Sequence, residues 1–399
     1  MHFLVITDAY YPTRTSAAVL LQDLTKEWAD HGHLVTIIVP GSQLSPSIAI
    51  EKIDGSVCMS VTAFQTKDIG YVRRTLAEWI NPYLIGRALK RDLSFCQTHF
   101  DAIIWYSPSI FWGPLIAQLK RRFQCPAYLI LRDIFPDWAL DLGLLKKNGV
   151  YHFFKKVAAA QYQQAEVIGV QSPNNRSYFL KRNPKLNANV EVLWNWIQPT
   201  HTQFCSIDIS KTSLAGRKIA VYAGNVGVAQ GRQALLALVG ALRIHDNLGF
   251  VFVGRGREMQ GLKEAVQEQA LKHVLFFDEI APSEIPGLYA QCHIGLVALD
   301  PRHQTHNIPG KFVSYMQSGL PVFAVVNPGN DLVDLIETHQ VGVAKTAMKD
   351  AILKDGASQL LSLLKHDPSA QKRCVQLAAE LFSPAQASQQ IFSALKLQQ

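Results

Sequence analysis

The sequence predicts an α/β protein of two domains, each built on a parallel β-sheet with helices on both faces. The chain has 399 residues, which is enough to bury two separate cores. Apolar runs of strand length alternate with helix-length segments along the whole chain, as parallel sheets require. A polar, irregular stretch at 198–217 divides these runs into two groups and is expected to be the interdomain linker.

The predicted strands follow in chain order. The first group is Phe3–Ile6, Leu34–Val39, Ala102–Tyr106, Ala127–Leu131, Val167–Val170 and Val190–Leu193. The second group is Ile219–Ala223, Gly249–Val253, Val274–Phe277, Ile294–Leu299 and Val322–Val326. Apolar positions at helical spacing predict a last helix within 384–399.

The cysteine spacing, the N-terminal segment and the uncharged runs exclude several classes of protein. The six cysteines form no C-x-x-C pair, so neither a disulfide framework nor a zinc site is indicated, and a reducing cytoplasm fits. The N-terminal segment lacks the basic and small-residue features of a signal peptide. The longest uncharged run, 102–119, contains two prolines and a glycine, so it is expected to form strand, turn and helix rather than a membrane span.

The net charge of +8 is concentrated before residue 200. This excess could attract an anionic membrane surface, although plain solvation explains it as well. No nucleic-acid motif accompanies it, so nucleic acid is not an expected partner. Residues 69–93 mix aromatic side chains with Arg and Lys, as an interfacial helix does, but a core-facing amphipathic helix has the same composition. Pro82 is expected to interrupt this helix.

The stretch 303–331 predicts an anion site. A loop at 307–310 follows an apolar strand and opens a short helix, Lys311–Ser318, which Gly319 ends. Free backbone N–H groups at such a helix start attract anions, and Lys311 adds a positive charge. The alternative is an ordinary βαβ crossover with a surface lysine.

Two further segments predict ligand contacts. VYAGNVGVAQG, at 221–231, follows a strand and opens a helix, so its glycines would allow close approach to a pyrophosphate. In the first domain, Arg132 and Asp133 end a strand at the sheet edge where ligands bind. Asp133 could orient or deprotonate a hydroxyl group, with Arg132 keeping it ionised. Alternatively, Asp133 caps a helix and pairs with Arg132.

The runs IPGKFVSYMQSGLPV and NPGND, together with the pattern RD-x-x-P-D, resemble glycosyltransferase family 4, and within it the WbuB-like O-antigen L-fucosamine transferases. The resemblance implies the GT-B fold: two Rossmann-like domains, 1–198 and 199–383, whose sheets face across a cleft, with the last helix, 384–399, crossing back onto the first. It implies transfer of an N-acetyl-6-deoxyhexosamine, L-FucNAc, from a UDP-sugar to a polyprenyl-diphosphate-linked sugar. The protein would lie on the cytoplasmic face of the plasma membrane and use neither cofactor nor metal.

The resemblance also implies site residues. The catalytic residues would be Asp133, Arg132 and Lys311. The donor-binding residues would be Ser16, Ala17, Gly224, Asn225, Gly227, Gln230, Arg232, Arg255, Glu279, Ile280, His306, Asn307, Ile308, Pro309, Gly310 and Ser314. The family usually has two Glu where this chain has His306 and Ser314, and two phosphate-clamping cations where it has Asn225 and Gln230. Arg232, Arg255 or Lys311 must then supply the positive charge, and the stereochemical outcome stays open.

Two other functions fit the same features. A GT-B-like UDP-sugar epimerase shares both domains and the glycine-rich loop, but it needs no acceptor surface. A non-catalytic scaffold of an assembly complex would explain the missing Glu pair. The basic, aromatic stretch 69–93 favours a transferase with a membrane-linked acceptor.

Overall fold

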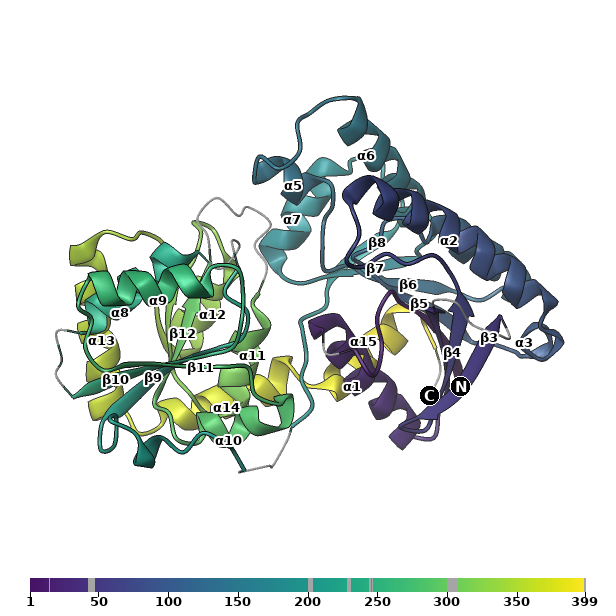
Figure 1. Cartoon of the computed structure of the whole chain (residues 1–399). Coiled ribbons are helices and arrows are strands. Elements are labelled where there is room, and N and C mark those ends of the chain that lie inside the picture. The colour runs from purple at the N-terminus through teal and green to yellow at the C-terminus, as the bar shows by residue number, and fades with distance from the viewer. Residues whose placement is uncertain are drawn as a thin grey trace. The chain divides into compact units, whose positions relative to one another are not determined.

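The computed structural model describes residues 1–13, 15–41, 47–199, 204–227, 231–243, 245, 247–299 and 308–397. Two compact units account for the chain (Figure 1). The N-terminal domain comprises residues 1–197 and 384–399, and the C-terminal domain comprises residues 198–383. The α/β class with two parallel-sheet domains is confirmed.

The N-terminal sheet has the order β3-β4-β2-β1-β5-β6-β7-β8. Its strands are β1 (His2–Ile6), β2 (Leu34–Gly41), β3 (Ile48–Ile53), β4 (Ser56–Thr62), β5 (Ala102–Tyr106), β6 (Ala127–Ile130), β7 (Val167–Val170) and β8 (Asn189–Val192). Neighbouring strands are parallel except β3, which pairs antiparallel with β4 at the sheet edge. The sequence analysis missed β3 and β4, because β3 is largely exposed and its apolar alternation is short.

Eight helices of the described chain belong to this domain: α1 (Ser16–Asp30), α2 (Tyr71–Arg91), α3 (Leu93–Gln97), α4 (Gly113–Phe123), α5 (Asp137–Asp141), α6 (Gly149–Tyr162), α7 (Pro173–Arg182) and α15 (Pro384–Ala394). The expected interruption at Pro82 is wrong, because α2 runs through it. Tertiary contacts hold the helix there: the side chain of buried Asn81 accepts from the Phe64 N–H at 2.8 Å and donates to the Phe64 carbonyl at 2.9 Å.

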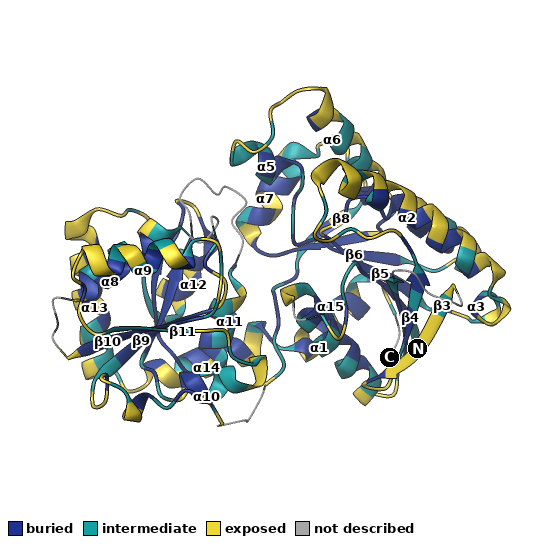
Figure 2. Cartoon of the chain, viewed as in Figure 1, coloured by how far each residue is buried: buried dark blue, intermediate teal, exposed yellow. Residues whose placement is uncertain are grey.

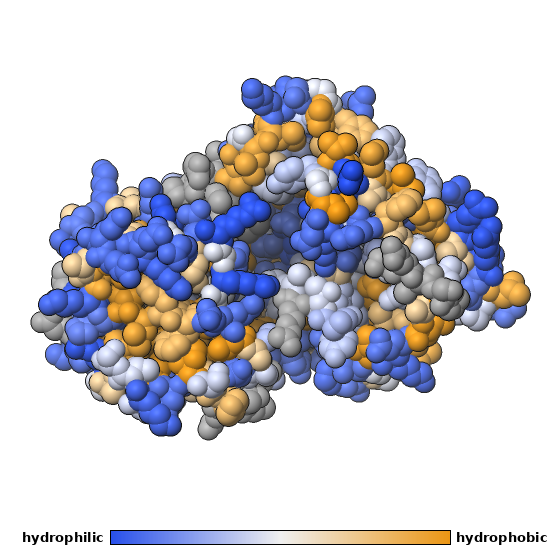
Figure 3. All heavy atoms as spheres, viewed as in Figure 1, coloured by the Kyte–Doolittle hydropathy of each residue, from blue (hydrophilic) through white to orange (hydrophobic). Residues whose placement is uncertain are grey.

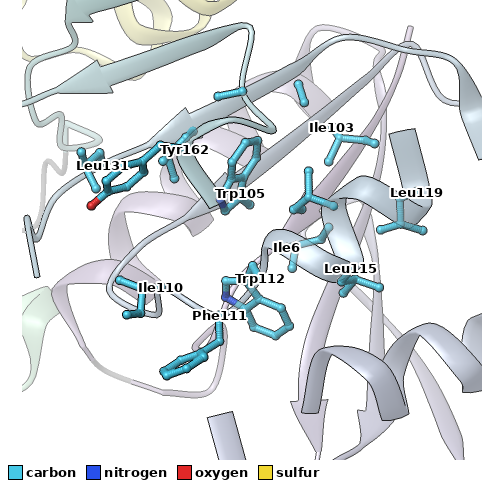
Figure 4. Close-up of a cluster of buried hydrophobic side chains, with 14 of the residues drawn as sticks. Ile6, Ile103, Trp105, Ile110, Phe111, Trp112, Leu115, Leu119, Leu131 and Tyr162 are labelled. Carbon is cyan, nitrogen blue, oxygen red and sulfur yellow. The ribbon is translucent and has the colours of Figure 1, made fainter. Parts of the chain in front are cut away.

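Apolar side chains cover both faces of this sheet. On one face, side chains from β1, β5, the segment after β5 and α4 pack together, including Ile6, Trp105 and Trp112 (Figure 4). On the other face, α15 packs against α1. The ring of Phe392 stacks on Phe3 with centroids 5.1 Å apart, and Trp28 Nε1 donates to Ser388 Oγ at 2.8 Å. The last helix is therefore part of the N-terminal core.

The C-terminal sheet is entirely parallel, in the order β11-β10-β9-β12-β13-β14. Its strands are β9 (Lys218–Ala223), β10 (Leu248–Val253), β11 (Val274–Phe277), β12 (Ile294–Ala298), β13 (Val322–Val325) and β14 (Gly342–Lys345). Its helices are η1 (Ile209–Lys211), α8 (Arg232–Leu242), α9 (Met259–Glu268), η3 (Pro282–Glu284), α10 (Ile285–Tyr289), α11 (Gly310–Gln317), α12 (Asp331–His339), α13 (Asp350–His366) and α14 (Ala370–Leu381). Buried strands lie between helices whose outer faces are exposed (Figure 2).

Candidate active site

In the C-terminal domain, the loops that follow β9 and β10 stay paired beyond the sheet. The Gly224 N–H donates to the Val253 carbonyl at 2.8 Å, and the Val226 N–H donates to the Arg255 carbonyl at 2.8 Å. This pairing fixes the backbone of Gly224 and Asn225, both exposed, at the carboxyl edge of the sheet. Ligands of parallel α/β sheets bind at this edge.

Glycine is required where the two loops meet. Gly254 has φ +135°, and a Cβ there would lie 2.3 Å from the carbonyl oxygen of Gly224. Gly256 has φ +142°, and a Cβ there would lie 2.2 Å from the carbonyl oxygen of Val226. Since neither position has space or a suitable backbone for a side chain, the loop after β9 keeps its shape only with glycine opposite it.

Lys311 lies in the first turn of α11, next to the loop that follows β9. Its Nζ is 4.6 Å from the ring centroid of Tyr222, and its Cε is 3.9 Å from the place where a Gly224 Cβ would stand. In the part of the chain that the structure describes, no carboxylate pairs with the amine. Burial lowers the pKa of Lys311 to about 8. A desolvated cation in the first turn of a helix has the features that favour anion binding.

The other expected donor residues of this domain have varied surroundings. Arg255 Nε pairs with Glu279 Oε2 at 3.1 Å, and both side chains are exposed. Arg232 Nε lies 3.8 Å from Glu258 Oε2, beside the start of α9. The Ser314 hydroxyl donates to the Gly310 carbonyl at 3.3 Å, within α11.

The remaining expected positions fall into three groups. The first lies in the described part of the C-terminal domain: Ile308 is buried, Pro309 is the N-cap of α11, and Gly227 and Ile280 are partly exposed at loop ends. Gln230, His306 and Asn307 lie outside the described residues. Ser16 and Ala17 belong to the first turn of α1, in the N-terminal domain, where Thr15 Oγ1 accepts from the Ala18 N–H at 3.4 Å. No His, Cys, Asp and Glu of the described chain gather as a metal site.

At the carboxyl edge of the N-terminal sheet, the Ser107 hydroxyl oxygen accepts from the N–H groups of Arg132 at 2.8 Å and Asp133 at 3.3 Å. The guanidinium of Arg132 is turned inward. It donates to the carbonyls of Gly169 and Trp194, each at 3.3 Å, and forms no ion pair with Asp133. Arg132 therefore positions the strand ends, and Asp133 is the member of the pair with chemistry available to a ligand.

Two features of Asp133 bear on its expected role. Burial raises its pKa, and the charge of Arg132 offsets part of that effect, which is the direction expected of a neighbour that favours the ionised form. Asp133 also caps no helix, because α5 begins at Asp137 with Pro136 as its N-cap. The buried Asp137 is structural, since it accepts from the Tyr151 hydroxyl at 2.8 Å and from Lys155 Nζ at 2.9 Å.

Sequence reasoning missed two residues. Tyr222, in β9, supplies the ring against which Lys311 lies. Asp8 follows β1, and its Oδ2 accepts from the Ser109 N–H at 3.3 Å. Burial, with Glu78 nearby, raises the pKa of Asp8 to about 7. A carboxylate two residues beyond an apolar strand was the available signal, and it is the same signal that identified Asp133.

Comparison with known proteins shows similarity to glycosyltransferases. Residues 217–365 match the glycosyl transferases group 1 family. The chain is 21% identical to the probable glycosyltransferase WbjE of Pseudomonas aeruginosa, over 54% of each protein, so the match spans about half of that relative. It is 24% identical to the putative colanic acid biosynthesis glycosyl transferase WcaI of Escherichia coli K12, over 68% of this chain and 69% of WcaI.

Solved structures show that the fold is GT-B. One of them, Anabaena HepE in complex with UDP-glucose, aligns with a TM-score of 0.67 and 16% identity over 99% of both chains. The matched family and both relatives are glycosyltransferases, which supports a transferase enzyme. They do not reach the L-fucosamine subgroup.

The glycine contact leads to a stability prediction. Gly254→Ala forces a Cβ against the carbonyl of Gly224, so the free energy of unfolding of the C-terminal domain should fall by at least about 1–3 kcal/mol. Gly240→Ala is the matched control, because nothing lies within 4 Å of a Cβ there and the residue is inside α8. It should raise stability by about 0.4–1 kcal/mol. Denaturant unfolding of both variants measures the difference, and equal stabilities would contradict the close approach.

Proposed function

We propose that this chain, whose residues 217–365 match the glycosyl transferases group 1 family, transfers a sugar from a UDP-sugar to a lipid-linked sugar. The donor would be an N-acetyl-6-deoxyhexosamine nucleotide, UDP-L-FucNAc, and the acceptor a polyprenyl-diphosphate-linked sugar. The observation that carries the proposal is Lys311, a partly buried cation without a carboxylate partner in the described chain, next to an exposed glycine loop.

The C-terminal domain would hold the donor diphosphate. Backbone N–H groups at the start of α11 and the amine of Lys311 would stabilise the negative charge that grows on the leaving UDP. This is electrostatic stabilisation at the place where charge develops, and it acts strongly in a desolvated site. HepE, a structural neighbour, is solved with UDP-glucose, which supports a UDP-sugar as the donor class.

The N-terminal domain would meet the acceptor and the membrane. Helix α2 exposes a run of large apolar side chains at helical spacing: Val72, Leu76, Trp79, Ile80 and Tyr83. Trp79 contacts Phe153 of α6 with ring centroids 5.3 Å apart, and hydrophobic side chains cover this part of the surface (Figure 3). No described helix is long and apolar enough to span a bilayer. We therefore propose peripheral binding on the cytoplasmic face through α2.

A donor and acceptor panel tests the function. The purified chain is incubated with UDP-L-FucNAc, other UDP-sugars and polyprenyl-diphosphate-linked sugars, and the products are read by mass spectrometry. We expect a glycosylated lipid and free UDP. Conversion of the UDP-sugar without any acceptor would instead support the epimerase, and UDP binding without turnover would support the scaffold.

Lys311→Ala should weaken UDP binding by about 1.5–3 kcal/mol, the range for a hydrogen bond to a charged group. UDP affinity should also fall as pH rises through about 8, because the free amine loses its proton there. Calorimetry in two buffers should show proton uptake on binding near this pH. Lys263→Ala is the control, since its Nζ also lies over an aromatic ring, Phe276, at 5.8 Å. Equal UDP affinity in both variants would remove Lys311 from the site.

Membrane binding should be electrostatic as well as apolar. Glutamine at four cations of α2, Arg73, Arg87, Lys90 and Arg91, should release the protein from anionic vesicles, because each cation near such a surface contributes about 1 kcal/mol. Arg74 stays, since it pairs with Glu78 at 2.6 Å. The control replaces four exposed lysines of the C-terminal domain, Lys272, Lys354, Lys365 and Lys372. Flotation measures binding, and release by the control set alone would contradict this surface.

Asp133→Asn should slow transfer by about 10²–10⁴-fold if the carboxylate takes the acceptor proton. Burial raises the pKa of Asp133, which makes its carboxylate a stronger base. UDP affinity should not change, because Lys311 and the glycine loops belong to the other domain. The melting temperature of the variant is the control for folding. Near-normal transfer by a stable Asn variant would exclude Asp133 as the base.

A further inference from the structure

Asp8 occupies a fixed place that the proposed chemistry has not used. It lies two residues beyond β1, in a turn where the Thr7 hydroxyl donates to the Ala9 carbonyl at 3.0 Å. The Ser109 N–H donates to its carboxylate at 3.3 Å. Ser109 is itself fixed by a hydrogen bond, because Nε2 of the fully buried Gln161 donates to its carbonyl at 3.0 Å.

A small cavity opens beside the carboxylate. Asp8, Glu78, Asn81 and Trp112 are among the residues that line it, and it has a volume of about 10 Å³. That is room for one oxygen atom of a water molecule or a hydroxyl group. The carboxylates of Asp8 and Glu78 can accept a hydrogen bond there, and a hydroxyl group of a ligand can donate one.

The charges around Asp8 leave it poorly compensated. Glu78, from α2, has the same sign and is nearby, while Arg74 of the same helix is committed to Glu78 at 2.6 Å. The Ser109 N–H, Arg74 and Lys67, just before α2, each lower the pKa of Asp8. Burial and Glu78 outweigh these and raise the pKa of Asp8 to about 7. A fold selected for stability alone gains nothing from such a carboxylate, whereas binding sites often contain one.

We propose that Asp8 is a specificity-determining contact to the acceptor, and that its carboxylate accepts a hydrogen bond from an acceptor hydroxyl whose oxygen enters the cavity beside Glu78. The inference rests on the proposed transferase function and names a second polar anchor for the same substrate. Ser107 binds the backbone of Asp133, and Ser109 binds the side chain of Asp8. The short segment after β5 thus joins the two carboxylates, which allows them to engage different hydroxyl groups of one sugar.

The test uses transfer from the UDP-sugar to the lipid-linked acceptor found with the panel above. Asp8→Asn keeps an oxygen for the Ser109 N–H but removes the charge. It should lower kcat/KM for the acceptor by about 10- to 100-fold, the range for a charged hydrogen bond, and leave the KM for the UDP-sugar within about twofold. Asp68→Asn, at an exposed turn, is the matched control and should change neither value.

A pH profile separates this role from a structural one. In the wild type, kcat/KM for the acceptor should rise with pH through about 7, as Asp8 ionises. Glu78→Gln removes the like charge, so the rise should move to lower pH, and Asp8→Asn should lack it. The stability of Asp8→Asn at pH 8 should equal or exceed that of the wild type. A carboxyl with a raised pKa costs stability as pH rises from its unfolded value through its folded value, and Asn avoids that loss.

Three results would overturn the inference. The first is wild-type acceptor kinetics in Asp8→Asn, which leaves the transferase function intact. The second is an unshifted rise in Glu78→Gln, which decides the matter even if Asp8→Asn does not fold. The third is the absence of transfer by the wild type on the panel, which overturns the proposed function together with the inference.

Discussion

The contact between the amine of Lys311 and the ring of Tyr222 organises the C-terminal domain. Tyr222 lies near the end of β9, and its hydroxyl donates to the Asn225 carbonyl at 2.9 Å, so the residue also helps to position the loop that follows. That loop lies close to the loop after β10 because Gly254 and Gly256 have no side chains. Tyr222 therefore contacts the glycine loop through its hydroxyl and the amine of Lys311 through its ring.

Charged groups in this protein fall into two kinds. Asp137, Lys155, Arg182 and Asp141 satisfy one another inside the N-terminal domain, with Lys155 Nζ 2.9 Å from Asp137 and Arg182 Nη2 3.1 Å from Asp141. Lys311 and Asp8, in contrast, are partly buried with little compensation, and burial moves their pKa values in opposite directions, both toward neutrality. Buried charges that pair with one another help to define how side chains pack. Buried charges without a partner are more frequent at binding sites. In the described residues, Lys311 lies at the carboxyl edge of the C-terminal sheet, and Asp8 lies at the carboxyl edge of the N-terminal sheet, as Asp133 does.

The sequence was sufficient for the fold class, because buried parallel strands appear as continuous apolar runs. It did not reveal β3 and β4, whose pairing depends on an exposed edge, nor the continuity of α2 through Pro82, which depends on tertiary contacts of Asn81. At the candidate site, the sequence predicted where Lys311 and Asp133 lie, at the start of α11 and just after β6, because loop residues follow an apolar run in both places. Their roles stay predictions. The inward direction of Arg132 could not, since its acceptors, the carbonyls of Gly169 and Trp194, are 37 and 62 residues away.

The position of α15 has a consequence for how the protein is made. Phe392 stacks on Phe3, and Ser388 bonds Trp28 across 360 positions of sequence, so the N-terminal domain shares its core with a segment that is synthesised after the whole C-terminal domain. The C-terminal domain is one continuous segment, 198–383, so it is fully synthesised before α15. At that point the N-terminal domain still lacks α15, which packs against α1. The C-terminal domain is therefore completed before the N-terminal domain, although the N-terminal domain begins first. Until α15 emerges, the apolar face of β1 and α1 stays uncovered, and this is the interval in which the nascent chain needs protection from aggregation.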